Sequence, residues 1–301
     1  MEYILFAVLA LLSSVGNTIF NRISSHKIGS VLSATIKSIM ITFACFFICL
    51  AFGHVNSLYS LDKEQWLWII LLGFVTVVDW LFYFLALKRS HLEAFAPFDA
   101  SAILFTSNLL FYIFMPESST NGGSARNIIL VSIGLIFVFL SMIYAVFNKK
   151  INPVEKLTWV IYSLISATAL AFTLVVATKI KQTGVASDVI AFHQMFIVFI
   201  VCALMLVFSK DKFEIKNLKG KVYLNFFISA VFNALLMVFR YLALGQANSN
   251  QSVVNVIVGL DFVFVSIAAV LFFKEKNKKE LLILIILVVA GMIFNALPAL
   301  I

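Results

Sequence analysis

Ten long runs of apolar residues follow one another along this 301-residue chain, separated by short polar loops. A spanning helix needs about 20 mostly apolar residues, and a bilayer accepts only helices or closed barrels, because every backbone polar group must be satisfied internally. Barrel strands would alternate in polarity, and these runs do not. The sequence therefore predicts an all-α integral membrane protein with ten transmembrane helices. The expected spans are approximately 3–21, 30–53, 65–87, 91–115, 126–148, 156–179, 187–209, 222–244, 249–273 and 279–298.

Composition supports this class. Apolar residues make up 62% of the chain and charged residues 12%, with a mean hydropathy of +1.07, whereas soluble domains carry about 25% charged residues. The first run lacks a basic leader and a cleavage site, so we expect it to be a retained helix. Three cysteines, Cys45, Cys49 and Cys202, lie inside apolar runs without metal-ligand spacing. They are expected to be packing residues, and we expect no metal and no cofactor.

The basic residues predict how the chain is oriented. The net charge is +8, but the lysines and arginines lie in short loops beside the spans and form no contiguous basic domain. We therefore expect the lipid bilayer as a partner and no nucleic acid. One set of loops, including Ser209 to Lys221, holds most of these residues, which favours the cytoplasmic side. With ten spans this places both termini outside the cytoplasm, in a plasma membrane (a bacterial inner membrane); the reversed orientation is the alternative.

The chain contains an internal repeat. The stretch from Phe82 to Glu117 and the stretch from Phe239 to Glu275 both run from an aromatic-Leu-Ala-Leu helix end, through a polar turn, into an apolar span closed by Glu. Two halves of five spans are therefore expected, residues 1–150 and 151–301. Because five is odd, the second half must be inverted relative to the first, and such inverted repeats are typical of secondary transporters.

The motifs "FLAL" through Glu117 and "YLAL" through Glu275 resemble the EamA-like branch of the drug/metabolite transporter superfamily. The resemblance covers essentially the whole chain. It implies ten helices around a central cavity, alternating access, and no chemistry on the cargo. The sequence departs from the family pattern at Ile103, Asp261 and Pro116, so the resemblance bears on the fold and leaves the cargo open.

Charged residues inside spans are costly and usually face a cavity, a partner or the bundle interior. Asp79, Asp99, Arg240 and Asp261 have no charged counterpart in the other half, which favours a role in recognising an asymmetric cargo. Helical spacing places Tyr83 on the face of Asp79 and Asn233 on the face of Arg240. The candidate substrate-binding or cavity-lining residues are therefore Asp79, Tyr83, Asp99, Asn233, Arg240 and Asp261. Lys37 and His193 fall near each other when the halves are compared, and are candidates for gating or coupling.

Each candidate has a structural alternative. Lys37 paired with Asp79 or Asp99 would explain these residues without cargo. Arg240 lies near the end of its span and has the reach to extend outward to water. His193 is compatible with a neutral, hydrogen-bonded role. Asp261 lies near the middle of its span with no basic residue in that run, so it needs a partner on another helix, a proton, or a cationic cargo.

The function that these residues favour is secondary active transport of a small polar or amphipathic metabolite, an amino acid or an amine, with proton coupling as an option. Direction, coupling ion and oligomeric state stay open. A flippase for lipids or lipid-linked substrates with the same fold is the alternative. A membrane enzyme is disfavoured, because the four histidines are scattered and no HExxH, Gly-x-Ser-x-Gly or glycine-rich phosphate loop occurs.

Overall fold

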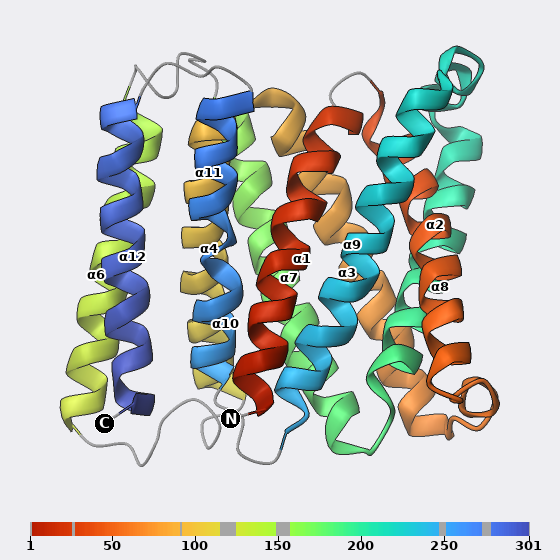
Figure 1. Cartoon of the computed structure of the whole chain (residues 1–301), viewed down its shortest axis with the longest axis horizontal. Helices are drawn as coiled ribbons and strands as arrows, with labels where there is room; N and C mark the ends of the chain where they lie inside the picture. The colour runs from red at the N-terminus through yellow and green to blue at the C-terminus, as the bar shows by residue number, and fades with distance from the viewer. Residues whose placement is uncertain are drawn as a thin grey trace.

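The computed structural model describes residues 2–25, 28–90, 92–114, 125–148, 157–246, 251–272 and 278–300, and these residues are helical apart from short turns. The helices stand side by side in one bundle (Figure 1). The α-helices are α1 (Glu2–Ser25), α2 (Ser30–Ala51), α3 (Lys63–Arg89), α4 (Leu92–Phe114), α6 (Ala125–Phe147), α7 (Thr158–Gln182), α8 (Ser187–Phe208), α9 (Gly220–Leu244), α10 (Gln251–Gly259), α11 (Asp261–Phe272) and α12 (Lys278–Leu300). Two short 3₁₀ helices are η1 (Asn56–Leu58) and η2 (Lys210–Asn217).

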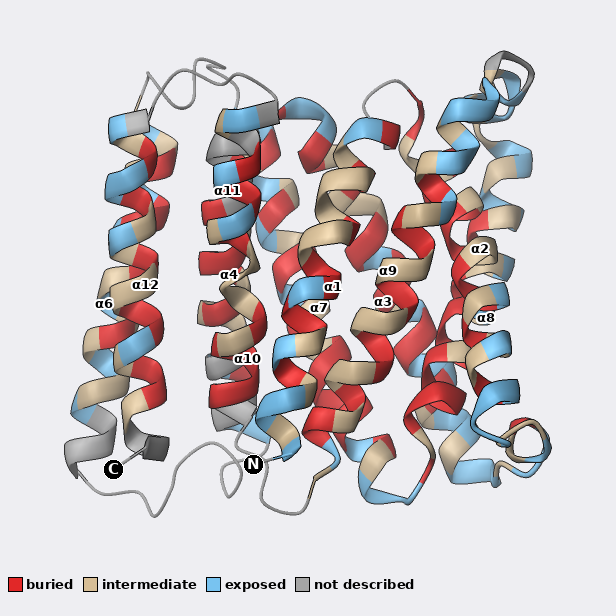
Figure 2. Ribbon diagram, viewed as in Figure 1, coloured by how far each residue is buried: buried red, intermediate tan, exposed pale blue. Residues whose placement is uncertain are grey.

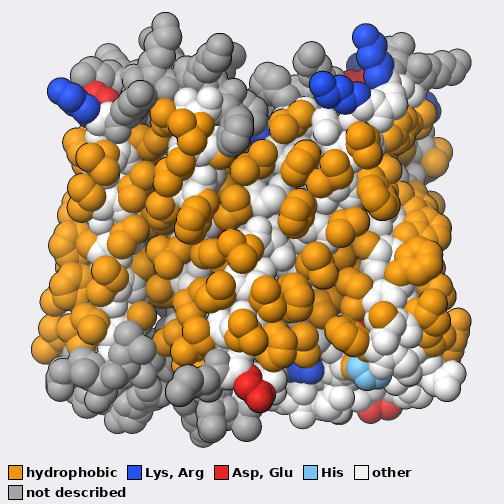
Figure 3. Space-filling model, in the orientation of Figure 1, with side chains coloured by type: hydrophobic (Ala, Val, Ile, Leu, Met, Phe, Trp, Pro, Cys, Tyr) orange, Lys and Arg blue, Asp and Glu red, His pale blue; other side chains and the backbone are white. Residues whose placement is uncertain are grey.

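Eight of the described helices, α1, α2, α3, α6, α7, α8, α9 and α12, are long and apolar enough to cross a membrane. Val253–Ala268 is a shorter apolar segment. Long apolar side chains such as Phe43, Phe47 and Leu204 remain exposed. On the face that Figure 3 shows, apolar side chains form a belt, and the charged side chains lie near its two ends. This surface is the one that a bilayer would cover, since lipid tails rather than water suit exposed apolar side chains.

The expected ninth span is interrupted. The prediction of one continuous helix over 249–273 is corrected to two helices, α10 and α11, which meet at a turn at Leu260. Glycine is a poor helix former, and Gly259 ends α10. An acidic residue is favoured in the first turn of a helix, and Asp261 begins α11. The sequence signal was present, but the surrounding run is so apolar that the hydropathy pattern conceals the break.

Helices of the two halves pack on one another. The most extensive contacts join α1 with α9, α3 with α7, α2 with α8, and α6 with α12. Exchanging the halves turns the α1–α9 contact into the α7–α3 contact and leaves the other two pairings unchanged, as two repeats related by a two-fold axis require. Helix α1 begins and α12 ends at the same end of the bundle (Figure 1). The predicted boundary at 150/151 and the closing residues Glu117 and Glu275 lie outside the described residues.

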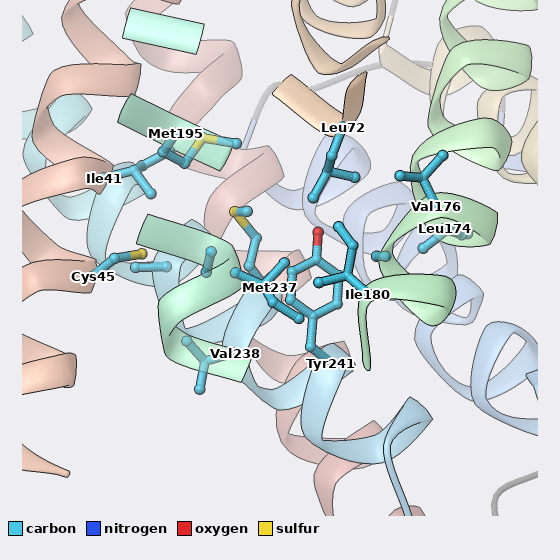
Figure 4. Packing of buried hydrophobic residues seen from close by; sticks show 14 of the residues in the cluster. Ile41, Cys45, Leu72, Leu174, Val176, Ile180, Met195, Met237, Val238 and Tyr241 are labelled. Carbon is cyan, nitrogen blue, oxygen red and sulfur yellow. The ribbon is translucent and has the colours of Figure 1, made fainter. Parts of the chain in front are cut away.

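Apolar side chains fill the contacts between the helices. Buried residues lie where helices meet and exposed ones along their outer sides (Figure 2). Figure 4 shows Met237 and Tyr241 of α9 in the middle of one cluster, near side chains of α2 and α7. Cys45, Cys49 and Cys202 belong to this cluster, are fully buried and form no disulfide. The cluster holds α2, α8 and α9 together beside the charged residues described below.

Polar groups at one end of the bundle secure the beginning of α2. Glu214 Oε2 accepts a hydrogen bond from the Gly29 backbone N–H at 2.6 Å, and Asp211 Oδ2 accepts one from the Val31 N–H at 3.0 Å. The η2 segment therefore caps the positive end of α2. A Cβ atom at Gly29 would lie 2.0 Å from Asp211 Cγ, so this approach requires glycine.

At the opposite end, the loop between α2 and α3 lies on the start of α8. His54 Nδ1 lies 2.9 Å from Asp188 Oδ1, and the Asp188 side chain is only 3% exposed. The α3 helix begins there with a capping box, in which Asp62 accepts from the Gln65 N–H and Gln65 accepts from the Asp62 N–H. These contacts fix the loop over the end of the bundle.

Candidate functional site

A polar cavity of about 180 Å³ lies inside the bundle. Its walls come from the helices α1, α2, α3, α4, α7, α8, α9, α10 and α11, with one residue from α12. Seven of the eight residues singled out from the sequence line it, namely Lys37, Asp79, Tyr83, Asp99, Asn233, Arg240 and Asp261. The two halves thus bring their charged residues together at one place.

Lys37 is held by amide oxygens. Its side chain is 1% exposed, and Nζ donates to Asn17 Oδ1 at 2.6 Å and to Asn21 Oδ1 at 2.8 Å. The ammonium group also lies 5.1 Å from the centre of the Trp80 ring, within cation–π range. In the described part of the chain, no carboxylate oxygen lies within 4.0 Å of Nζ. The hypothesis that Lys37 forms an ion pair with Asp79 or Asp99 is therefore wrong.

Asn17 and Asn21 of α1 line the cavity, and the sequence analysis missed both. Asn17 Oδ1 also accepts from Ser229 Oγ at 3.1 Å and from Asn233 Nδ2 at 3.2 Å, and Ser229 Oγ lies 2.9 Å from Asn21 Oδ1. This network joins α1, α2 and α9. The signal that could have revealed it is the spacing of Asn17 and Asn21, which are four residues apart and so share one face of a helix.

Two of the three cavity carboxylates are bonded to serine hydroxyl groups of the opposite half. Ser166 Oγ on α7 donates to Asp79 Oδ1 at 2.7 Å. Ser14 Oγ on α1 donates to Asp261 Oδ2. The partner of Asp261 on another helix is therefore a neutral hydroxyl group. Because Asp261 also begins α11, its carboxylate lies at the interruption of the ninth span, beside the cavity.

The remaining two charged residues have atoms that no described residue binds. Within the described part of the chain, Asp99 Oδ1 and Arg240 Nε are buried without a hydrogen-bond partner. Arg240 Nη2 donates to Asn255 Oδ1 at 3.0 Å. Arg240 therefore lines the cavity and does not extend outward to water. A buried charged atom without a partner is costly, so both atoms are suited to binding a group that enters the cavity.

Gln194 is the counterpart of Lys37. Helices α2 and α8 both contain 22 residues, and Lys37 and Gln194 are each the eighth. Gln194 Nε2 donates to Thr76 Oγ1 at 2.7 Å, and Tyr241 OH donates to Gln194 Oε1 at 2.6 Å. Matching Lys37 with His193 was one residue off, which on a helix turns the side chain by about 100°.

His193 is the one candidate that does not line the cavity. Its Nε2 lies 3.1 Å from the Leu58 carbonyl oxygen, and its ring packs against Trp66 with centroids 4.9 Å apart. Because Leu58 belongs to the loop between α2 and α3, His193 anchors that loop.

A second hollow lies between α3 and α7 on the outer surface of the bundle. Its lining is Val75, Val78, Leu164, Ile165, Thr168, Ala169 and Phe172. None of these described residues also lines the polar cavity. The hollow is therefore an apolar groove distinct from the charged site.

Two segments of the chain, residues 1–140 and 157–297, match the model of the EamA-like transporter family. The chain belongs to the EamA-like transporter family. This family lies within the drug/metabolite transporter superfamily, so the resemblance seen in the two repeats is confirmed, and the chain is a transporter-like membrane protein. A solved structure titled only "Crystal structure of protein" is similar over 99% of this EamA-family chain and 98% of its own, with 17% identity and a TM-score of 0.66. At 17% identity, the similarity between the two structures is evidence for a shared fold and for nothing further. The comparison with curated proteins gave no match.

Proposed function

We propose that this EamA-family protein is a secondary active transporter that moves a small amino acid or amine across the membrane by alternating access. The observation that carries the proposal is the pair of unsatisfied charged atoms, Asp99 Oδ1 and Arg240 Nε, in one cavity. An ammonium group can donate to the first and a carboxylate can accept from the second, each through a charge-assisted hydrogen bond. An amino acid carries both groups, and an amine carries one.

The rest of the cavity supports the same class of cargo. Apolar side chains of α4, α11 and α12, including Ile103, Phe262 and Met292, line it together with the charged residues. Such a mixed wall suits a small molecule with a charged head and an apolar side chain. Inverted repeats that meet around a site let the same residues face each side of the membrane in turn.

The test is flux into proteoliposomes that contain the purified protein. The panel consists of neutral and cationic amino acids, amines, nucleotides and sugars. Amino acids or amines are expected to enter the proteoliposomes faster than they enter protein-free liposomes. Nucleotides and sugars are expected to enter both at the same rate. Entry of only sugars or nucleotides would contradict the proposal, because the unsatisfied atoms of Asp99 and Arg240 would then have no matching groups.

A lipid flippase was the alternative function. Its headgroup would have to pass from the bilayer into the charged cavity. The outward groove between α3 and α7 is apolar, and it shares no described lining residue with that cavity. We therefore keep a water-soluble cargo as the proposal.

The orientation is part of the proposal. With both termini outside the cytoplasm of a plasma membrane, the loop from Ser209 to Lys221 is cytoplasmic. A single cysteine replacing exposed Lys212, in a chain whose three buried cysteines are changed to alanine, should resist a membrane-impermeant thiol reagent added to intact cells. The matched control is Ser60→Cys in the loop at the opposite end, which should react. The reverse labelling pattern would overturn the orientation and leave the fold intact.

A further inference from the structure

The charged residues of the cavity do not balance. Among the described residues, its lining contains two cations, Lys37 and Arg240, and three carboxylates, Asp79, Asp99 and Asp261, so their formal charges sum to −1. The other titratable residues of the lining, Tyr83 and Tyr241, are uncharged near neutral pH. His193 lies elsewhere, against Leu58. The cavity therefore has one negative charge in excess.

These five groups are also not paired with one another. Lys37 is bonded to asparagine, Asp79 and Asp261 to serine, and Arg240 to Asn255. Over the described residues, the one contact within 4.0 Å between a basic nitrogen and a carboxylate oxygen is the distant His54–Asp188 contact. The excess charge therefore belongs to the cavity as a whole, and no local salt bridge absorbs it.

An uncompensated charge away from water is costly, and most costly inside a membrane. Each time the cavity closes to both sides, it must therefore contain one added positive charge. A proton from water, bound to one of the three carboxylates, supplies this charge when no cargo is present. A cargo with one positive charge supplies it when bound, and the proton then returns to water.

On the basis of the proposed function, we infer that the cavity exchanges one monocationic cargo molecule for one proton. The cation enters from one side and displaces a proton to that side; on the other side a proton displaces the cation. One positive charge crosses in each direction, so the exchange is electrically neutral. A neutral zwitterion leaves the proton in place, and its transport is not driven by a pH gradient.

Lysine and choline are the probes, because each carries one positive charge near neutral pH and neither crosses a lipid bilayer readily. In proteoliposomes with a tenfold higher proton concentration inside, one-for-one exchange should accumulate a transported probe about tenfold at steady state. A tenfold potassium gradient with valinomycin, which imposes a membrane potential but no pH gradient, should leave the accumulation unchanged because no net charge moves.

Asp261→Asn tests the charge sum. It brings the formal charge of the cavity to zero, and the asparagine oxygen can still accept from Ser14. The variant should lose accumulation in response to the pH gradient. It should also lose the flux of both cationic probes, because a bound monocation would leave one uncompensated positive charge in the closed cavity, whereas neutral amino acids should still enter. Asp79→Asn makes the same change of charge on α3, and it replaces Asp261→Asn in this experiment if that variant does not fold.

Asp62→Asn is the matched control. Asp62 lies outside the cavity at the beginning of α3, where asparagine caps a helix equally well, so the pH response should be retained. Accumulation of the probes by the wild-type protein that follows the membrane potential would overturn the inference. So would an unchanged pH response in Asp261→Asn, or flux of neutral amino acids with none of lysine or choline. That last outcome leaves the proposed function standing, whereas no flux of any amino acid or amine overturns both.

Discussion

Arg240→Lys should lower the transport of amino acids about 30-fold, measured as kcat/KM, while choline transport changes little. The variant keeps the charge of the cavity but removes the guanidinium Nε, which no described residue binds and which we assign to the cargo carboxylate. A charge-assisted hydrogen bond of this kind contributes about 2 kcal/mol, and 1.4 kcal/mol corresponds to a factor of ten. Choline has no carboxylate and so does not use this donor.

Lys212→Arg is the control for this prediction. It alters an exposed basic side chain in η2, far from the cargo, and should leave the transport of both probes unchanged. Equal losses for amino acids and choline in Arg240→Lys would show that the residue maintains the cavity without recognising a carboxylate.

Asn17→Leu should destabilise the folded protein by about 3 kcal/mol, because it removes an oxygen from a buried ammonium group and strands part of its charge. It also leaves Ser229 and Asn233 without their shared acceptor. Thermal unfolding of the purified protein in detergent, followed by loss of its monodisperse elution peak, measures the effect as a lower Tm. Asn56→Leu, an exposed asparagine in η1, should change stability by less than about 0.5 kcal/mol.

Adding Lys37→Met to Asn17→Leu should recover part of the lost stability, because the cation that needed the oxygen is then absent. Residues that share one network are expected to be coupled in this way. If the losses of stability from the two substitutions simply add in the double variant, the view that Asn17 stabilises the buried ammonium group of Lys37 is wrong.

The sequence predicted the eight helices that are long and apolar enough to span a membrane, and the five charged residues of the described cavity lining, for the same physical reason. Lipid tolerates few polar groups, so an apolar run indicates a helix, and a charge within it, such as Asp79 or Arg240, indicates an interior position. Neutral polar residues carry a weaker signal. Ser14, Ser166 and Gln194 are of types that occur in many membrane helices, and only the structure shows that they bind the cavity charges or bridge neighbouring helices.

The errors have the same origin. The structural alternative for Lys37 was a pair with a carboxylate, because attraction between opposite charges is the simplest compensation for burial. Two amide oxygens and an aromatic ring compensate it instead, and their arrangement depends on the rotation of α1 about its axis, which hydropathy does not determine. His193 was placed only near Lys37, whereas the offset between Phe82 and Phe239, carried to Lys37 without a gap, leads to Gln194.

The capping of α2 by η2 bears on how the protein is made. The backbone N–H groups of Gly29 and Val31 are bonded by carboxylates that lie 185 and 180 residues later in the chain. During synthesis α2 is complete long before Glu214 and Asp211 leave the ribosome. Until then, water at the membrane surface must accept the hydrogen bonds of these two N–H groups. Helices α1 and α2 therefore insert early, but the N-terminus of α2 receives its capping carboxylates only after α8 has crossed the membrane. A chain truncated before η2 would contain every residue of α2 and still lack the groups that complete it.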